Sequence, residues 1–213
     1  MDVLEAKQIV CDAGRKLVEE GLVARTWGNI SARVDANRFV ITPSGRTYEA
    51  LTPDDIVEIN MEDLSYEGDI KPSSEKGLHA GAYKLSAAIN AVVHTHQMNA
   101  STVAAARREV PAVNEEMAKI IGSSIKVAPY GLPGTGKLAT GTAAALEGRK
   151  AALMANHGAV CVGVDMEEAF LVARTLEEAC QAYIEGEFLK VSGLDAFSFE
   201  AMHEYYLKKF SAR

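Results

Sequence analysis

Two apolar runs separated by one histidine constrain the fold of this chain more than any other feature. They are AALMAN (151–156) and GAVCVG (158–163), with His157 at their junction. Each run is short and apolar, as buried strands are. Antiparallel strands can be joined by a tight turn, whereas parallel strands need a crossover of a dozen or more residues. The two runs therefore predict an antiparallel pair with His157 at its turn.

The rest of the chain alternates further strand-like runs with helical stretches. The strand-like runs are NISARV (29–34), RFVITP (38–43), IVEIN (56–60), AAINAVVHTH (87–96) and SIKVAPY (124–130). The apolar spacing and capping residues predict helices over 3–20, 74–86, 98–107, 137–146, 165–189 and 197–210. No linker or repeat divides the chain, so we predict a single α/β domain over 1–213 with a largely antiparallel sheet.

Composition excludes several classes of function. The net charge is −7, which argues against a nucleic-acid or acidic-membrane surface, since both need a basic footprint. No run of about 18 apolar residues predicts a membrane span. Cys11, Cys161 and Cys180 form no CxxC pair, and the acidic N-terminal segment is unlike a signal peptide. We therefore expect free thiols, a cytoplasmic location, and no nucleic-acid or membrane partner.

A histidine pair ends one of the predicted strands. His94 and His96 are two residues apart, so on a strand they point to the same face. Two neutral imidazoles suit a borderline divalent ion such as Zn²⁺. The alternative is that the pair only packs or hydrogen-bonds. A catalytic zinc site needs a third protein ligand and one open position, so the metal hypothesis depends on another histidine.

Three other histidines are available as that third ligand. His157 is the best candidate, because a turn histidine followed by Gly158 can approach a metal without backbone crowding. His79 lies four residues after Glu75, hence on the same helical face, and we expect it to be a supporting or core residue. His203 lies in a polar predicted helix and is expected to be solvated.

The segment KPSSE (71–75) has two interpretations. Ser73, Ser74 and Glu75 suit a helix start, because serine caps a helix and a carboxylate is favoured in the first turn. The alternative uses the same physics: hydroxyls and free N–H groups at a helix N-terminus bind phosphate, and Glu75 beside them serves as a general acid/base.

Two glycine-containing loops carry similar groups. They are TWGNIS (26–31) and ITPSG (41–45), which offer backbone N–H groups and the side chains of Asn29 and Ser44. With KPSSE they could form a neutral phosphate cradle. GLPGTGKL (131–138) matches the first part of a P-loop motif, G-x-x-x-x-G-K, but Leu138 occupies the position where Ser or Thr must hold Mg²⁺. We interpret it as a loop that leads into a helix.

In this order and at these separations, TWGNIS, ITPSG, KPSSE, HTH and NHG resemble the class II aldolase/adducin family, and within it the L-fuculose-phosphate aldolase type. The resemblance covers about residues 2–190. It implies a three-layer α/β/α domain with a mainly antiparallel sheet. It also implies a homotetramer with active sites near subunit interfaces. One Zn²⁺ per subunit, with Mn²⁺ or Co²⁺ as alternatives, would be held by His94, His96 and His157.

The resemblance further implies a reaction and its residues. A ketose 1-phosphate would be cleaved reversibly to dihydroxyacetone phosphate and an aldehyde, with Glu75 as the acid/base. The residues implied in phosphate binding are Gly28, Asn29, Ser44, Gly45, Ser73 and Ser74.

One position departs from the pattern. Fuculose-phosphate aldolases have a tyrosine at one position that reaches a neighbouring active site. The matching segment here is PAVNEEMAK, and Glu115 occupies that position. A 5-deoxypentulose 1-phosphate or its methylthio analogue is therefore as plausible a substrate as L-fuculose 1-phosphate. Alternatives within the family are a methylthioribulose-1-phosphate dehydratase and a pentulose-phosphate 4-epimerase, although epimerases resemble this chain with an aspartate near the Glu75 position. A non-catalytic adducin-like scaffold should have lost the histidines.

Overall fold

A mixed sheet forms the centre of the computed structural model, which describes residues 1–23, 27–192, 204, 208 and 209. Its strands are β1 Asn29–Arg33, β2 Arg38–Ile41, β3 Val57–Asn60, β4 Ala91–Thr95, β5 Val110–Pro111, β6 Ser124–Ala128, β7 Ala151–Met154 and β8 Gly158–Gly163. In this described part, eight strands follow the order β3-β2-β1-β4-β8-β7-β6-β5. All neighbouring strands pair antiparallel except β6 and β7, so the predicted mainly antiparallel sheet is confirmed.

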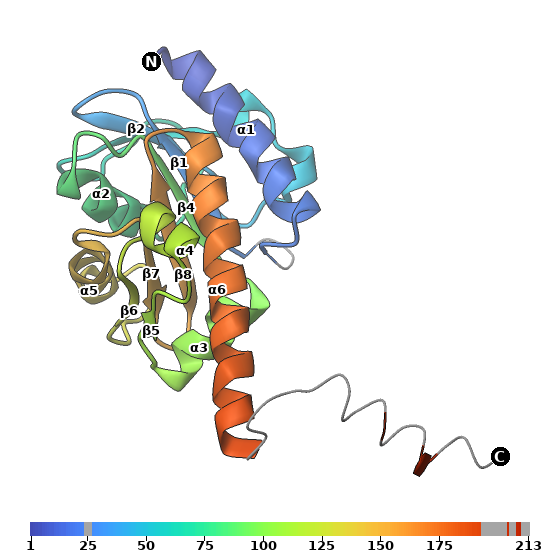
Figure 1. Ribbon diagram of the computed structural model, residues 1–213. Coiled ribbons are helices and arrows are strands. Elements are labelled where there is room, and N and C mark those ends of the chain that lie inside the picture. The colour runs from blue at the N-terminus through green and yellow to red at the C-terminus, as the bar shows by residue number, and fades with distance from the viewer. Residues whose placement is uncertain (24–26, 193–203, 205–207, 210–213) are drawn as a thin grey trace.

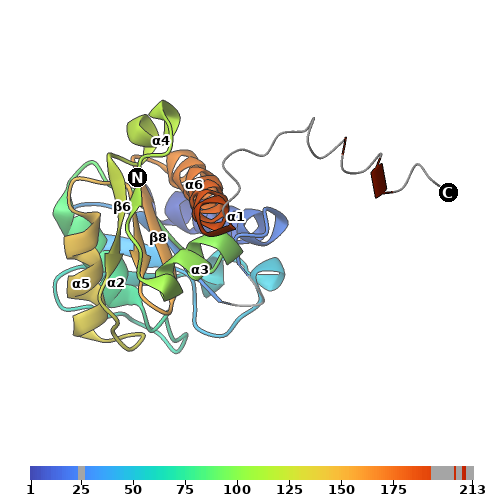
Figure 2. The same ribbon diagram turned by 60° about the horizontal axis from the view of Figure 1, so that its bottom comes forward.

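Helices cover both faces of the sheet (Figure 1). One layer consists of α1 Val3–Glu19, α3 Met98–Ala106, α4 Glu115–Ile120 and α6 Met166–Ser192, and the other of α2 Lys76–Leu85 and α5 Gly136–Leu146. Figure 2 shows the two layers from the end, with α2 and α5 on one side of the strands and α1, α3 and α6 on the other. The 3₁₀ helices η1 Tyr48–Ala50 and η2 Pro53–Asp55 lie between β2 and β3. The three-layer arrangement is therefore confirmed.

The alternation of side chains along β4 decides which layer the histidines face. Ala91 and Val93 pack into the core shared with α1, α3 and α6, whereas Val92 packs into the core shared with α2 and α5. Because successive strand residues point to opposite faces, His94 lies on the same side as Val92. His94 is fully buried and faces the layer in which α2 begins.

The predicted boundaries hold for most elements, with differences that have local causes. Strand β5 and helix α4 were not predicted, because two and six residues are too short to show a periodicity. Helix α2 begins at Lys76 rather than at Ser74. Helix α6 begins as expected, with Asp165 Oδ1 accepting from the N–H of Glu168 at 2.8 Å.

Two predictions extend beyond what the structure describes. The predicted helix over 197–210 and His203 lie almost entirely outside the described residues, so a single domain over 1–213 stays a prediction. Helix α6 has 27 residues, yet neither it nor another described helix is apolar enough to span a bilayer.

Candidate active site

Three histidines converge at one edge of the sheet. His94 lies in β4, His96 follows the end of β4, and His157 lies in the turn between β7 and β8. One ring nitrogen from each lies within 4.8 Å of the others, and the Nε2 atoms of His94 and His96 are 2.9 Å apart. Ligand nitrogens around a tetrahedral zinc ion are about 3.4 Å apart, as bond lengths near 2.1 Å require. The structure therefore brings together the three predicted metal ligands.

The pairing of β4 with β8 brings His157 to this edge. Thr95 pairs with Ala159, so the turn of the β7–β8 hairpin lies next to the end of β4. Gly158 makes the approach possible, because a Cβ atom there would lie 2.4 Å from the backbone oxygen of Thr95. The glycine beside His157 therefore lets the turn lie close against the end of β4.

Hydrogen bonds and burial favour the ligand form of these rings. The carbonyl oxygen of Ala159 lies 2.8 Å from Nδ1 of His94 and accepts its proton, which directs Nε2 towards the cluster. Burial, reinforced by His94, lowers the pKa of His96 to about 3 and also lowers the pKa of His157. Both rings are therefore neutral at neutral pH, as metal binding requires.

The carboxylate of Glu75 lies against the histidines rather than on its own helix. Glu75 occupies the N-cap position of α2, yet its side chain makes no capping hydrogen bond. Oε2 lies 3.2 Å from Nε2 of His94, and Oε1 lies 3.5 Å from Nε2 of His157. Asn29 Nδ2 donates to Oε2 at 2.9 Å. The interpretation of Glu75 as a helix cap alone is therefore wrong.

The Glu75 carboxylate also matches a cation electrostatically. Burial raises its pKa, but the adjacent His94 and the hydrogen bond from Asn29 more than offset burial and hold the pKa well below its usual range. Three imidazole nitrogens with an ionised carboxylate at this distance form a donor set that fits a divalent cation.

The predicted phosphate loops lie side by side next to this cluster. The N–H of Ser44 donates to the carbonyl of Lys71 at 2.9 Å, and the N–H of Ser73 donates to the carbonyl of Thr42 at 3.1 Å. These bonds join ITPSG to KPSSE. Gly28 has φ +93°, and a Cβ atom there would lie 2.6 Å from the carbonyl oxygen of His94, so Gly28 packs directly on β4.

A cavity of about 450 Å³ connects the loops with the histidines and Glu75. It is lined by Trp27, Gly28, Asn29, Pro43, Ser44, Gly45, Ser73, Ser74, Glu75, His96, Pro133, Asn156 and His157. All the predicted phosphate residues are among them, and His94 lies buried beneath. No lysine or arginine is among these described lining residues. An anion bound here would be held by N–H groups and hydroxyls, as the sequence predicted for a neutral cradle.

Comparison with known proteins agrees with this geometry. A family profile described as "Class II Aldolase and Adducin N-terminal domain" matches residues 8–184. The chain belongs to the class II aldolase and adducin family. It is similar to a 5-deoxy-D-ribulose 1-phosphate aldolase of Bacillus thuringiensis, with 37% identity over 84% of each chain. It is also similar to the L-fuculose phosphate aldolase of Escherichia coli, with 37% identity over 84% of this chain and 82% of the other.

Solved structures of the aldolase family have the same fold. A structure titled L-fuculose 1-phosphate aldolase superimposes with a TM-score of 0.82 and 32% identity, covering 97% of this chain and 96% of the other. The agreement spans both helix layers and the sheet, so the resemblance inferred from five short motifs holds for the whole fold.

Sequence reasoning missed several residues of the aldolase-family pocket. Trp27 lies at the rim, with its ring centroid 6.0 Å from that of His96. Asn156 has a left-handed φ of +56° and accepts from Arg107 at 3.1 Å. Trp27 is the only tryptophan of the chain and adjoins the TWGNIS glycine, a signal that could have pointed to it. Glu115 does not line the pocket and is exposed, 3.3 Å from Lys119.

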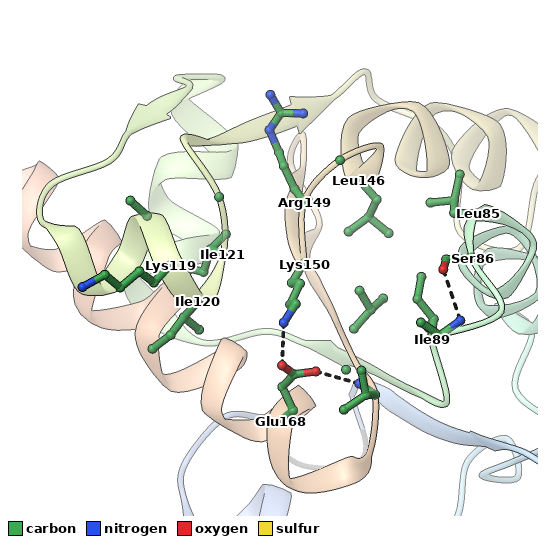
Figure 3. Close-up of a pocket in the computed structure, with 17 residues that line it drawn as sticks. Leu85, Ser86, Ile89, Lys119, Ile120, Ile121, Leu146, Arg149, Lys150 and Glu168 are labelled. Carbon is green, nitrogen blue, oxygen red and sulfur yellow. Dashed lines mark hydrogen bonds and ion pairs between the residues drawn. The ribbon is translucent and has the colours of Figure 1, made fainter.

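A second cavity lies at the opposite ends of the same strands. Figure 3 shows this cavity of about 410 Å³ between the end of α2, helix α4 and the end of α5, with Leu85, Ile89 and Leu146 on its wall. The ion pair of Lys150 with Glu168 at 2.5 Å lies at its edge. It contains none of the predicted site residues, so the histidine-lined cavity is the candidate active site of this family member.

Proposed function

We propose that this chain is a metal-dependent aldolase that reversibly cleaves a ketose 1-phosphate to dihydroxyacetone phosphate and an aldehyde. The observation that carries the proposal is the position of Glu75. Its ionised carboxylate lies within 3.5 Å of two histidines of the cluster and lines the same cavity as the serine loops. Similarity to aldolases of two ketose 1-phosphates supports this reaction.

The substrate phosphate would bind in the neutral loops. The side-chain groups would be the hydroxyls of Ser44, Ser73 and Ser74 and the amide of Asn29. Backbone N–H groups would come from Gly28, Gly45 and Ser74. The N-terminus of α2 directs its positive end towards the same cavity. This arrangement supports recognition of a phosphate without a basic side chain.

The metal would be held by His94, His96 and His157, one ion per subunit. We propose Zn²⁺, with Mn²⁺ or Co²⁺ as substitutes, because neutral imidazoles suit borderline ions. When bound, the ion supplies a Lewis acid that stabilises negative charge on the substrate oxygens.

Glu75 would move the proton at carbon 3. When the bond between carbons 3 and 4 breaks, the carbon 4 hydroxyl gives up its proton as the aldehyde forms, and carbon 3 must gain one. Glu75 is the buried carboxyl group among the described lining residues. In the cleavage direction its carboxylate would first take up a proton, balanced by the one that the carbon 4 hydroxyl releases, and then deliver it to carbon 3 to complete dihydroxyacetone phosphate. In the synthetic direction the same carboxylate removes that proton.

We also propose a homotetramer in the cytoplasm. Trp27, Met98 and Leu132 are large apolar residues with exposed fractions of 57%, 76% and 62%. Trp27 lines the cavity, and the other two lie within two residues of the cavity residues His96 and Pro133. Such exposure supports a contact between subunits close to the active site. The buried free thiols of Cys11, Cys161 and Cys180 support a reducing compartment.

A cleavage assay across a panel of ketose 1-phosphates tests the proposal. The metal-replete protein should release dihydroxyacetone phosphate and an aldehyde, and a chelator should stop the release. Because Glu115 replaces the tyrosine of fuculose-phosphate aldolases, we expect 5-deoxyribulose 1-phosphate or its methylthio analogue to be cleaved at least as well as L-fuculose 1-phosphate. A dehydrated diketone phosphate as the product would identify a dehydratase instead, and an inverted carbon 4 an epimerase.

A further inference from the structure

A buried chain of hydrogen bonds extends from Glu75 away from the cavity. Beyond Asn29, which donates to Glu75, Oδ1 of Asn29 lies 2.5 Å from Nε2 of His79. The other ring nitrogen of His79 lies 2.6 Å from Oγ of Ser31, and this oxygen lies 2.7 Å from the hydroxyl of Tyr83. Each of these side chains is buried. His79 and Ser31 have no exposed surface, so beyond Asn29, which lines the cavity, this series of hydrogen bonds is shielded from water.

Only one direction of donation satisfies every member of this chain. Nδ2 of Asn29 donates to Oε2 of Glu75 at 2.9 Å, so the amide oxygen, which can only accept, faces Nε2 of His79. Burial lowers the pKa of His79 to about 3, so the ring is neutral and carries one N–H. That proton must be on Nε2, so Nδ1 accepts from Ser31, whose oxygen in turn accepts from Tyr83.

The far end of the chain is fixed in place. The guanidinium of Arg33 lies 4.7 Å from the ring centroid of Tyr83 and donates to the carbonyls of Tyr83 at 2.7 Å and Ser86 at 3.0 Å. The ring of Phe39 packs on Tyr83 with centroids 5.3 Å apart. Arg33 thus caps the C-terminal carbonyls of α2 and packs against Tyr83, whose hydroxyl is the first donor of the series.

The near end of the chain distinguishes the two oxygens of Glu75. Asn29 donates to Oε2, whereas Oε1, 3.5 Å from Nε2 of His157, is buried and has no hydrogen-bond partner among the described residues. We propose that Ser31, His79 and Tyr83 are positioning residues that act through Asn29. They hold Oε2 of Glu75 and leave Oε1 to exchange the proton with substrate. This inference rests on the proposed aldolase reaction and extends it to residues that touch no substrate.

The proton positions can be tested without catalysis. Nitrogen NMR of the metal-free protein with ¹⁵N-labelled histidine distinguishes protonated from unprotonated ring nitrogens. We expect His79 to carry its proton on Nε2, protected from solvent exchange, at neutral pH. A proton on Nδ1 would reverse the direction of donation and overturn the inference.

Two variants at one position test the effect on Glu75. His79→Gln keeps one donor and one acceptor, whereas His79→Leu keeps neither. We expect His79→Leu to lower kcat, and the exchange of the carbon 3 hydrogen of dihydroxyacetone phosphate with deuterated solvent, by roughly 10- to 100-fold. KM and metal content should stay within about twofold, and His79→Gln should recover most of the loss.

A control variant tests whether removing any buried polar group lowers activity. Thr142→Val is the matched control, because its hydroxyl is buried in α5 without a hydrogen-bond partner among the described residues and outside the site. It should leave kcat and exchange unchanged. Equal losses in His79→Gln and His79→Leu, or a wild-type kcat in His79→Leu, would overturn the positioning role.

A milder variant keeps the test decisive if His79→Leu folds poorly. Tyr83→Phe removes one oxygen from the far end of the chain, and we expect a smaller fall in exchange at constant KM, with an unchanged rate counting against the inference. If wild-type protein neither cleaves any ketose 1-phosphate nor exchanges the hydrogen, the proposed function fails, and the His79 proton position still reports on the chain itself.

Discussion

Adding one methyl group at Gly158 tests the convergence of the three histidines. A Cβ atom at this position would lie 2.4 Å from the backbone oxygen of Thr95, whereas carbon–oxygen contacts between strands are normally about 3.3–3.6 Å. Both groups belong to the paired strands β4 and β8, so no flexible side chain can absorb the difference. Gly158→Ala should therefore move the turn that carries His157 by roughly 1 Å away from His94 and His96.

The magnitude follows from that displacement. Overpacking a well-packed interior costs about 1–3 kcal/mol, so the free energy of unfolding should fall by that amount in urea or thermal melts. A misplacement of about 1 Å can cost about 100-fold in rate, and we expect a loss of cleavage of that order. Metal affinity, measured by titration with Co²⁺, should fall at least about tenfold, since one ligand leaves its position.

A second glycine provides the control. Gly136 begins α5, and a Cβ atom there would meet nothing within 4 Å. Gly136→Ala should keep full activity and gain up to about 1 kcal/mol of stability, because alanine restricts the unfolded chain. A Gly158→Ala protein with wild-type metal affinity and cleavage rate would refute the placement of His157 against the end of β4.

Three further predictions concern single side chains. Glu75→Gln should retain the metal, measured by elemental analysis, and lose roughly 10²- to 10⁴-fold in turnover, and an unchanged rate would exclude an acid/base role. His157→Ala should fold, as circular dichroism would show, but hold less than one metal per subunit; full activity of this variant after chelator treatment would defeat the three-ligand site. Metal-free protein should lose stability as the pH falls from about 6.5 towards 3, because unfolded histidine takes up a proton near pH 6.5 while buried His79, with a pKa of about 3, does not. At pH 5 this amounts to about 2 kcal/mol, and urea unfolding of His79→Gln should show a shallower slope between pH 7 and 5.

Features that depend on neighbours in the sequence could be predicted. The strand period of two predicts that His94 and His96 share a face, and they do lie together although β4 ends at Thr95. The single residue between two apolar runs predicts an antiparallel hairpin with His157 at its turn. The cap at Asp165 likewise needs only residues one turn away. Even the neutral character of the phosphate loops follows from their glycines and serines, because backbone N–H groups are available wherever the chain turns.

Features that depend on contacts between distant segments of the sequence could not be predicted. The segment before α2 suits an N-cap equally well, and Glu75 turns away from that role because Asn29 and His94, 46 residues earlier and 19 later, lie across from it. His79 was expected to be a supporting or core residue, and only its hydrogen bonds across to β1 show that it joins Asn29 to Ser31. Local sequence thus determined which way side chains point, whereas sheet register and layer packing decided which of them meet, because those distances are set by contacts between segments far apart in the chain.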